Sequence, residues 1–157
     1  MRVVALIDNR VVASPLPPLP VFHGEGELPL LLNQYGPAET LQFAIAVGGA
    51  RGEDRLKLSH LLSSRGLQPH TIIHRTAFVA NDACLGPGCQ VLAMSAVCSS
   101  ARLDTSVIVN TAASIDHDCT VGSAAHIGGG GKIDVTENGR CNHAKRPDRN
   151  QRQFESR

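Results

Sequence analysis

The chain has 157 residues, a formal net charge of +1 at pH 7 and only 3% aromatic residues. A charge this close to zero creates no field that would attract nucleic acid, and no apolar run reaches the roughly 18 residues that a membrane span requires. We therefore expect no nucleic acid and no membrane as partner. Since the chain has no Trp and few large rings, Val, Ile, Leu and Ala must fill the core, which favours a thin and regular architecture.

The cysteine pattern indicates reduced thiols. Five cysteines are present, an odd number, and no CxxC occurs. Neither a disulfide framework nor a zinc knuckle is therefore predicted. Reduced thiols are typical of cytoplasmic proteins, and we find no signal-peptide pattern at the N-terminus, so a cytoplasmic location is expected.

Residues 1–68 are predicted to form a small, partial α/β domain with the strand and helix alternation of a Rossmann-like fold. Apolar runs predict buried strands at 3–8 and 43–47. A short helix is expected at 28–33 and an amphipathic helix at 52–65, with acidic residues in its first turn.

Gly48 and Gly49 follow the second predicted strand. A glycine turn in this position often faces a phosphate group, which makes Gly48 a candidate substrate-binding residue. A turn that simply requires positive φ is the competing interpretation, because neither GxGxxG nor GxxxxGK[ST] occurs.

From residue 73 onward an aliphatic side chain recurs at every sixth position without a gap. The positions are Ile73, Val79, Leu85, Val91, Val97, Leu103, Val109, Ile115, Val121, Ile127 and Ile133. Chance would produce this run with a probability on the order of 10⁻⁴. A period of six fits neither a helix nor a plain strand, but it fits a three-sided coil of about 18 residues.

Residues 69–135 are therefore predicted to form a left-handed parallel β-helix of hexapeptide repeats. The aliphatic side chains would point inward and stack on their equivalents one coil away, as in the ladder Ile73, Val91, Val109 and Ile127. Small residues four positions later would turn the corners. An ordinary β-sandwich is the alternative, but it does not predict an invariant spacing. A short β-helix leaves open ends, so oligomerisation or caps are expected.

The coil around His117 is unusually polar. His117 lies two residues beyond an inward aliphatic and should point outward, where a neutral imidazole can accept a proton from an attacking hydroxyl or amine. Asp118 or Asp116 could orient the ring and stabilise its cation. The competing interpretation is an ordinary solvated histidine.

A zinc-dependent, carbonic-anhydrase-like β-helix enzyme is a second alternative, because trimeric β-helix enzymes can hold zinc between subunits with three histidines. His117 and His126 would supply two of them. No third histidine has a suitable position, so we expect no metal.

After Ile133 the repeat stops. From Arg140 to Arg157 the chain has six Arg or Lys residues against two acids. Residues 136–157 are therefore predicted to be a basic, disordered tail, since they cannot bury enough apolar surface to order themselves. A basic arm for nucleic acid is the alternative interpretation.

Several stretches resemble one known family. They are residues 69–74, 109–113, 115–122 and 126–127, and the last three together give the pattern NT-x5-HD-C-x-(I/V)-G-x3-H-I. This pattern is similar to that of the sialic acid O-acetyltransferases and bacillosamine-type N-acetyltransferases, the NeuD/PglD-like sugar acetyltransferases. Residues 43–48 and the helix after them also resemble the second half of that family's N-terminal domain.

The resemblance implies an acetyltransferase that moves an acetyl group from acetyl-CoA to a hydroxyl or amino group of a sugar or nucleotide-sugar. It implies a homotrimer with active sites between neighbouring β-helices. His117 would be the general base and Asp118 would hold and polarise it. His126 would contact the sugar or cofactor region and Asn110 would lie near the same cleft, whereas no residue is assigned to coenzyme binding.

The sequence also departs from the family pattern. Gly129 replaces the proline that usually follows the His-Ile pair. The Gly-rich turn that opens the family's N-terminal domain and the coils that complete its coenzyme groove have no counterpart, so we expect a chain truncated at both ends. An inactive or structural β-helix trimer is therefore the non-enzymatic alternative.

Overall fold

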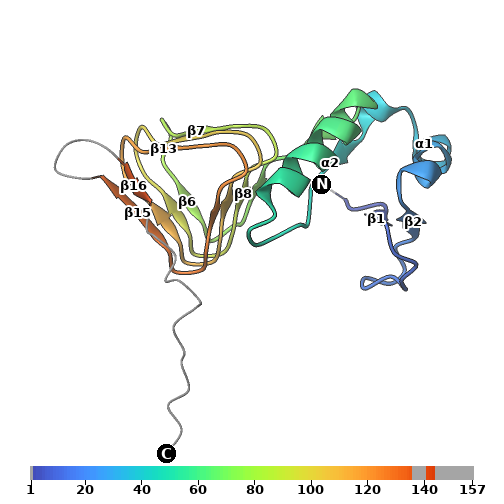
Figure 1. The fold of residues 1–157 in the computed structure, drawn as a ribbon, viewed down its shortest axis with the longest axis horizontal. Coiled ribbons are helices and arrows are strands. Elements are labelled where there is room, and N and C mark those ends of the chain that lie inside the picture. The colour runs from blue at the N-terminus through green and yellow to red at the C-terminus, as the bar shows by residue number, and fades with distance from the viewer. Residues whose placement is uncertain (1, 136–140, 144–157) are drawn as a thin grey trace, which may run out of the picture.

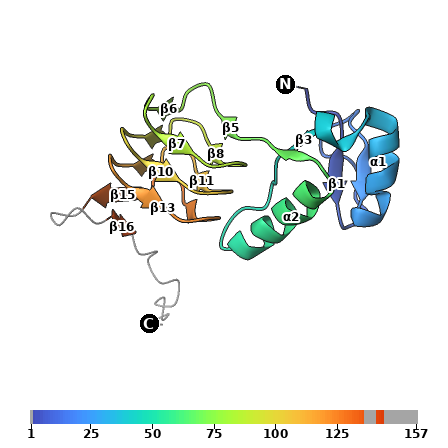
Figure 2. The same ribbon diagram turned by 90° about the horizontal axis from the view of Figure 1, so that it is seen from above.

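The computed structural model describes residues 2–135 and 141–143 (Figure 1). Residues 70–135 wind into triangular coils, and the preceding residues form a separate mixed α and β part beside them (Figures 1 and 2). The left-handed parallel β-helix predicted from the repeat is confirmed.

The coils stack their strands into three parallel sheets within the described residues. The first face contains β5 (Ile72–Ile73), β8 (Gln90–Val91), β11 (Ile108–Val109) and β14 (His126–Ile127). The second contains β6 (Phe78–Val79), β9 (Ala96–Val97), β12 (Ser114–Ile115) and β15 (Lys132–Val135). The third contains β7 (Cys84–Leu85), β10 (Arg102–Leu103) and β13 (Thr120–Val121).

The register of these sheets follows the repeat. Ile73 pairs with Val91, Val91 with Val109, and Val109 with Ile127, so each coil is 18 residues long. Every inward aliphatic from Val91 to Ile133 is buried, with at most 7% of its surface exposed. Ile73 is 51% exposed, because no coil precedes it to cover its outer side. The predicted ladder is confirmed, and its first member lies at the open end.

The corners depend on a backbone feature that the sequence did not reveal. Three positions after the inward aliphatic, the chain adopts positive φ in turn after turn. The non-glycine residues that do so are Met94, Ser100, Ser106, Ala112, Asp118 and Ala124, with φ between 54° and 59°. At several corners the next amide bonds back to the carbonyl three residues earlier, as from Ala113 to Asn110 at 2.9 Å. This is the pattern of a type II turn.

The part before the β-helix differs from the predicted α/β domain. Its strands form two separate parallel pairs among the described residues: β1 (Leu6–Asp8) with β2 (Val21–His23), and β3 (Gln42–Phe43) with β4 (Gln68–Pro69). The predicted burial of residues 3–8 is wrong, since Ile7 is 43% exposed. The strand predicted at 43–47 is also wrong beyond Phe43, because residues 44–47 have no neighbouring strand to pair with.

The helices agree better with the sequence. α1 (Leu28–Tyr35) and α2 (Gly52–Ser64) lie where helices are predicted, and short 3-10 turns occupy Glu25–Glu27 and Ala38–Thr40. Leu28, Ala38 and Leu67 form a small core that is distinct from the β-helix core. Two separate cores support the domain division at residue 68, which stays a prediction.

The C-terminal residues were expected to be a disordered tail. Within them, Cys141–His143 form β16, which pairs antiparallel with β15. The remainder of the predicted tail lies outside the described residues.

The burial gradient along the ladder predicts unequal mutational costs. Val109→Ala should lower the free energy of unfolding by about 2 kcal/mol, because it leaves a cavity in a fully enclosed rung. Ile73→Ala removes more carbon, yet it should cost less than about 1 kcal/mol because Ile73 is half exposed. Urea denaturation of both variants measures the difference, and equal costs would contradict the ladder as described.

Candidate functional site

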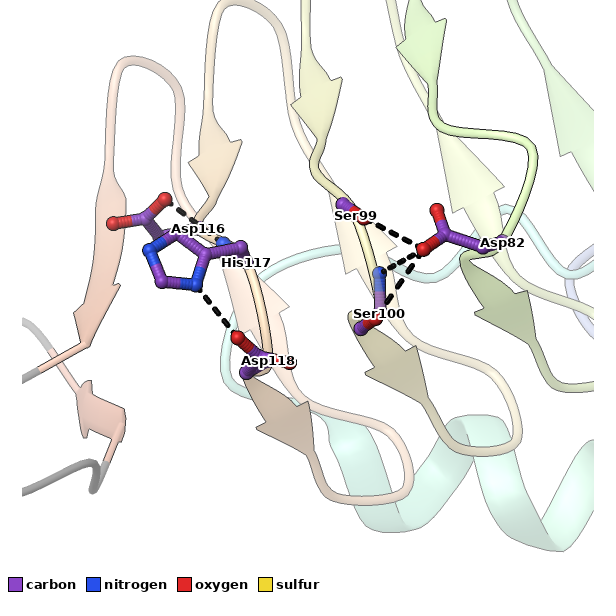
Figure 3. A network of polar contacts seen from close by, with 6 residues as sticks. All are labelled: Asp82, Ser99, Ser100, Asp116, His117 and Asp118. Carbon is purple, nitrogen blue, oxygen red and sulfur yellow. Dashed lines mark hydrogen bonds and ion pairs between the residues drawn. The ribbon is translucent and has the colours of Figure 1, made fainter.

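His117 and Asp118 occupy the corner that follows β12. The Nδ1 atom of His117 lies 2.7 Å from Oδ2 of Asp118 (Figure 3). The backbone N–H of His117 donates to Oδ1 of Asp116 at 2.8 Å. Asp118 has a φ of 59°, and this left-handed turn carries the carboxylate next to the preceding imidazole. Asp is one of the few side chains that tolerate this conformation well.

The acids around His117 favour its charged form. The hydrogen bond to Asp118 raises the pKa of His117 above its usual value of 6.5, and the negative charge of Asp116 raises the pKa further. The side chains of His117 and Asp118 are 58% and 68% exposed, so water screens this interaction. The Nε2 atom of His117 has no protein partner in the part of the chain that the structure describes, and it can meet a molecule from solvent.

The same corner of the previous coils supports this turn. Oδ2 of Asp82 accepts hydrogen bonds from the Ser99 hydroxyl at 2.6 Å and from the Ser100 amide at 3.1 Å (Figure 3). The amide of Asp118 then donates to the Ser99 carbonyl at 3.0 Å. These bonds lower the pKa of Asp82, the Ser99 hydroxyl contributing most. The turn that presents His117 therefore rests on an ordered turn below it.

Asn110 and His126 form a second polar group on another face of the β-helix. The Nδ2 atom of Asn110 lies 3.2 Å from Nε2 of His126, and Nδ1 of His126 lies 3.2 Å from the Gly49 carbonyl oxygen. His126 is outward-facing on β14 and is half-buried. A Cβ added at Gly48 would lie 3.9 Å from the ring of His126, so Gly48 is a neighbour of this group.

Residues 45–49 lie across this face and enclose a small hollow. The hollow has a volume of about 210 Å³ and is lined by Gly48, Asn110 and His126, together with Ile45, Ala46, Val47, Gln90, Leu92 and Ile108. A second hollow of about 460 Å³ lies between α2 and the β13–β14 turn, and His126 lines it too. His126 thus borders both hollows.

The structure brings the predicted residues together as two groups. His117 and Asp118 are in contact, and Asn110 and His126 are in contact with Gly48 beside them. His117 lines neither hollow, because β12 and β14 belong to different faces. Of the glycine pair, Gly49 has the positive φ, at 67°.

Arg55 is a residue of this region that the sequence reasoning missed. Only 1% of its surface is exposed, and it bonds to carbonyls of the segment that covers His126. Leu58 and Leu62 lie on the apolar side of the predicted helix, and Arg55 shares that side because it precedes them by three and seven positions. A charged residue on this side was the signal available in the sequence.

Within residues 2–135 and 141–143, no three His, Cys, Asp or Glu side chains gather as metal ligands would. The cysteines whose side chains are described, Cys84, Cys89, Cys98 and Cys119, are free thiols. None of the described helices has the length and apolar character to cross a membrane.

Comparison with known proteins relates the chain to acetyltransferases. No protein-family model matches it. The acetyltransferase domain of PglB from Neisseria gonorrhoeae, solved with acetyl coenzyme A, is 32% identical with a TM-score of 0.70 over 83% of this chain and 60% of that one. PerB from Caulobacter crescentus, solved with CoA and GDP-perosamine, is 30% identical with a TM-score of 0.66 over 73% of this chain and 53% of that one.

The chain therefore resembles sugar acetyltransferases in both sequence and fold. WeeI from Acinetobacter baumannii is 23% identical with a TM-score of 0.68 over 82% of this chain and 57% of that one, and it supports the fold alone. The chain spans about 60% of the length of the PglB domain. The predicted specificity for sialic acid is not among these findings.

The geometry around His117 predicts how its pKa responds to mutation. Asp118→Asn should lower the pKa of His117 toward its ordinary value, because the hydrogen bond to the carboxylate is the largest cause of the increase. Asn also tolerates the positive φ of this position, so the turn should persist. NMR titration of the imidazole C–H signals measures the shift. Asp116→Asn is the matched control and should lower the pKa less; an equal or larger effect would show that the pair is not the dominant contact.

Proposed function

We propose that this chain transfers an acetyl group from acetyl-CoA to an amino or hydroxyl group of a sugar or nucleotide-sugar, with His117 as general base. The observation that carries the proposal is the His117–Asp118 pair, exposed on a corner of the β-helix. The chain is 32% identical, over 83% of its length, to an acetyltransferase domain solved with acetyl coenzyme A. Acetyl-CoA would supply the activated acyl group as a thioester.

The chemistry follows from the two nitrogens of His117. Nδ1 donates to Asp118, which fixes the tautomer and leaves Nε2 with the lone pair. Nε2 removes the proton from the acceptor amine or hydroxyl as the acceptor attacks the thioester carbonyl. The new C–N or C–O bond forms, the C–S bond breaks, and the coenzyme thiolate recovers the proton from Nε2. Asp118 stabilises the imidazolium meanwhile. Direct transfer of this kind needs no covalent acyl-enzyme.

The acceptor is proposed to bind beside His126, Asn110 and Gly48. These residues combine a hydrogen-bonding histidine and amide with an unobstructed glycine, a donor and acceptor set that suits sugar hydroxyls. PerB was solved with GDP-perosamine, so a nucleotide-linked amino sugar is the first acceptor to test. An acetylation assay that compares amino sugars with hydroxyl sugars as acceptors decides whether the acceptor group is an amine or a hydroxyl.

A homotrimer would join the two groups of site residues. Within one chain His117 and the Asn110–His126 pair lie on different faces. The 210 Å³ hollow beside Asn110 and His126 is also smaller than the roughly 300 Å³ at which the usual range of small-molecule sites begins. A cleft between neighbouring copies could present His117 of one copy to His126 of the next. Such a protein would act in the cytoplasm, where acetyl-CoA is available.

Replacing His117 tests the proposed base. His117→Ala should lower kcat for acetyl transfer by about 10² to 10⁴, the usual contribution of a general base. The wild-type rate should rise with pH through the pKa of His117, because only the neutral ring accepts a proton. In Asp118→Asn this rise should move to lower pH, since the carboxylate that raises the pKa is gone.

His60→Ala is the control for that experiment, because His60 is an exposed residue of α2. Its activity should match the wild type. An unchanged rate in His117→Ala would exclude His117 as the base, and failure of the wild-type chain to bind acetyl-CoA in calorimetry would favour the structural alternative.

Mixing two inactive variants tests the proposed cleft. His117→Ala and His126→Ala chains, unfolded and refolded together, should regain up to about one quarter of the wild-type rate, because random trimers place an intact His117 opposite an intact His126 in that share of clefts. Light scattering should show three times the chain mass of 16.6 kDa. No recovery from a confirmed mixed trimer of two inactive variants would mean that both histidines act within one subunit.

A further inference from the structure

Arg55 lies at the point where α2 meets both the β-helix and the segment that covers His126. Its Nη1 donates to the Val47 carbonyl at 3.0 Å and to the Gly49 carbonyl at 3.4 Å. Its Nη2 donates to the Ala124 carbonyl at a β-helix corner. Gly52 makes this approach possible, because a Cβ there would lie 2.8 Å from the same Ala124 oxygen. The Arg55 side chain thus joins α2 to the 47–49 segment and to the β-helix corner at Ala124.

The cost of burying this guanidinium is not offset by a counter-charge. Arg55 is 1% exposed, and no described carboxylate forms a salt bridge with it. Its Nε has no hydrogen-bond partner in the described structure. Burial alone lowers its pKa. A buried charge held only by carbonyls is expensive, and an apolar side chain would anchor the helix at lower cost. A role beyond anchoring the helix is therefore expected, and it lies in the second contact of the Gly49 carbonyl, with His126.

The Gly49 carbonyl links Arg55 to His126. It accepts from Nη1 of Arg55 and also faces Nδ1 of His126 at 3.2 Å, so Nδ1 must carry the proton. The contact of the other ring nitrogen, Nε2, indicates the same tautomer. Oδ1 of Asn110 accepts from the Thr111 amide at 2.7 Å, which leaves the Asn110 NH₂ pointing at Nε2 of His126. Because NH₂ only donates, Nε2 must be the acceptor.

We propose that Arg55 is a positioning residue: by holding the Gly49 carbonyl, it fixes His126 as the neutral Nδ1–H tautomer, with Nε2 paired to Asn110 beside the acceptor-binding hollow. Arg55 does not line that hollow and acts through the backbone. The catalytic consequence rests on the acceptor-binding role proposed for His126, whereas the tautomer itself does not. Loss of Arg55 frees the 47–49 segment and lets the ring rotate or exchange its proton.

The tautomer of His126 is measured by ¹⁵N NMR on the full chain, with His126→Gln used to assign its signals. The wild type should show Nδ1–H, and Arg55→Met, which keeps most of the volume and removes every donor, should give a mixture of tautomers. Arg55→Lys should restore part of the wild-type spectrum, since an ammonium can reach a carbonyl. Arg65→Met is the matched control, because Arg65 is an exposed arginine just after α2.

Kinetics then separate positioning from general stability. Arg55→Met should raise KM for the sugar acceptor by about tenfold and leave KM for acetyl-CoA unchanged, whereas general destabilisation would affect both; misplacement by about 1 Å can cost up to 10²-fold. An Nε2–H tautomer in the wild type, or an unchanged tautomer in folded Arg55→Met, overturns the proposal. If Arg55→Met does not fold, the tautomer of His126 in the wild type and in Arg55→Lys tests the proposal instead. An inactive wild type with the expected tautomer refutes only the proposed function.

Discussion

Stacking of inward aliphatic side chains at intervals of 18 residues is the constraint on which the rest of the structure depends. Each rung is too short to bury its own side chain, and only the coils above and below exclude water from it. Burial therefore fixes the register, and the register fixes where every outward residue lies. Gln90, Ile108 and His126 form one outward column because Val91, Val109 and Ile127 form the inward one.

The corners of this rigid stack position the side chains of the proposed general base and its partner. The left-handed conformation at these turns costs roughly 1 kcal/mol or more for most side chains. The packing of the stacked strands offsets this cost. At the corner after β12 that residue is Asp118, so the strained position and the partner of His117 are the same residue. An exposed pair on a flexible loop would sample many geometries. Here the ordered turn around Ser99 supports the pair from below.

The flat outer face of the β-helix organises the segment before it. Residues 45–49 have no strand partner, and side chains bond to their carbonyls instead: Gln90 to Ile45 at 2.8 Å, and Arg55 and His126 to Gly49. These contacts join the parts that the sequence assigns to separate domains. The glycine turn that was considered for phosphate binding serves here as an acceptor of hydrogen bonds through its backbone, with Gly49 in the left-handed region.

The sequence by itself determined the β-helix and both helices, because a period of six and the start and end signals of a helix are local properties. It placed an acid on either side of His117, and the left-handed turn at Asp118 decided which of the two pairs with the imidazole. It was wrong about the burial of the strand at 3–8 and about a strand beyond Phe43 at 43–47, since apolar composition cannot say what covers a strand or whether a partner strand exists. Only the tertiary structure decided the link from Arg55 through Gly49 to His126. His126 is 77 residues from Gly49 in sequence, and only the docking of the 45–49 segment and α2 onto one face of the coil brings them into contact.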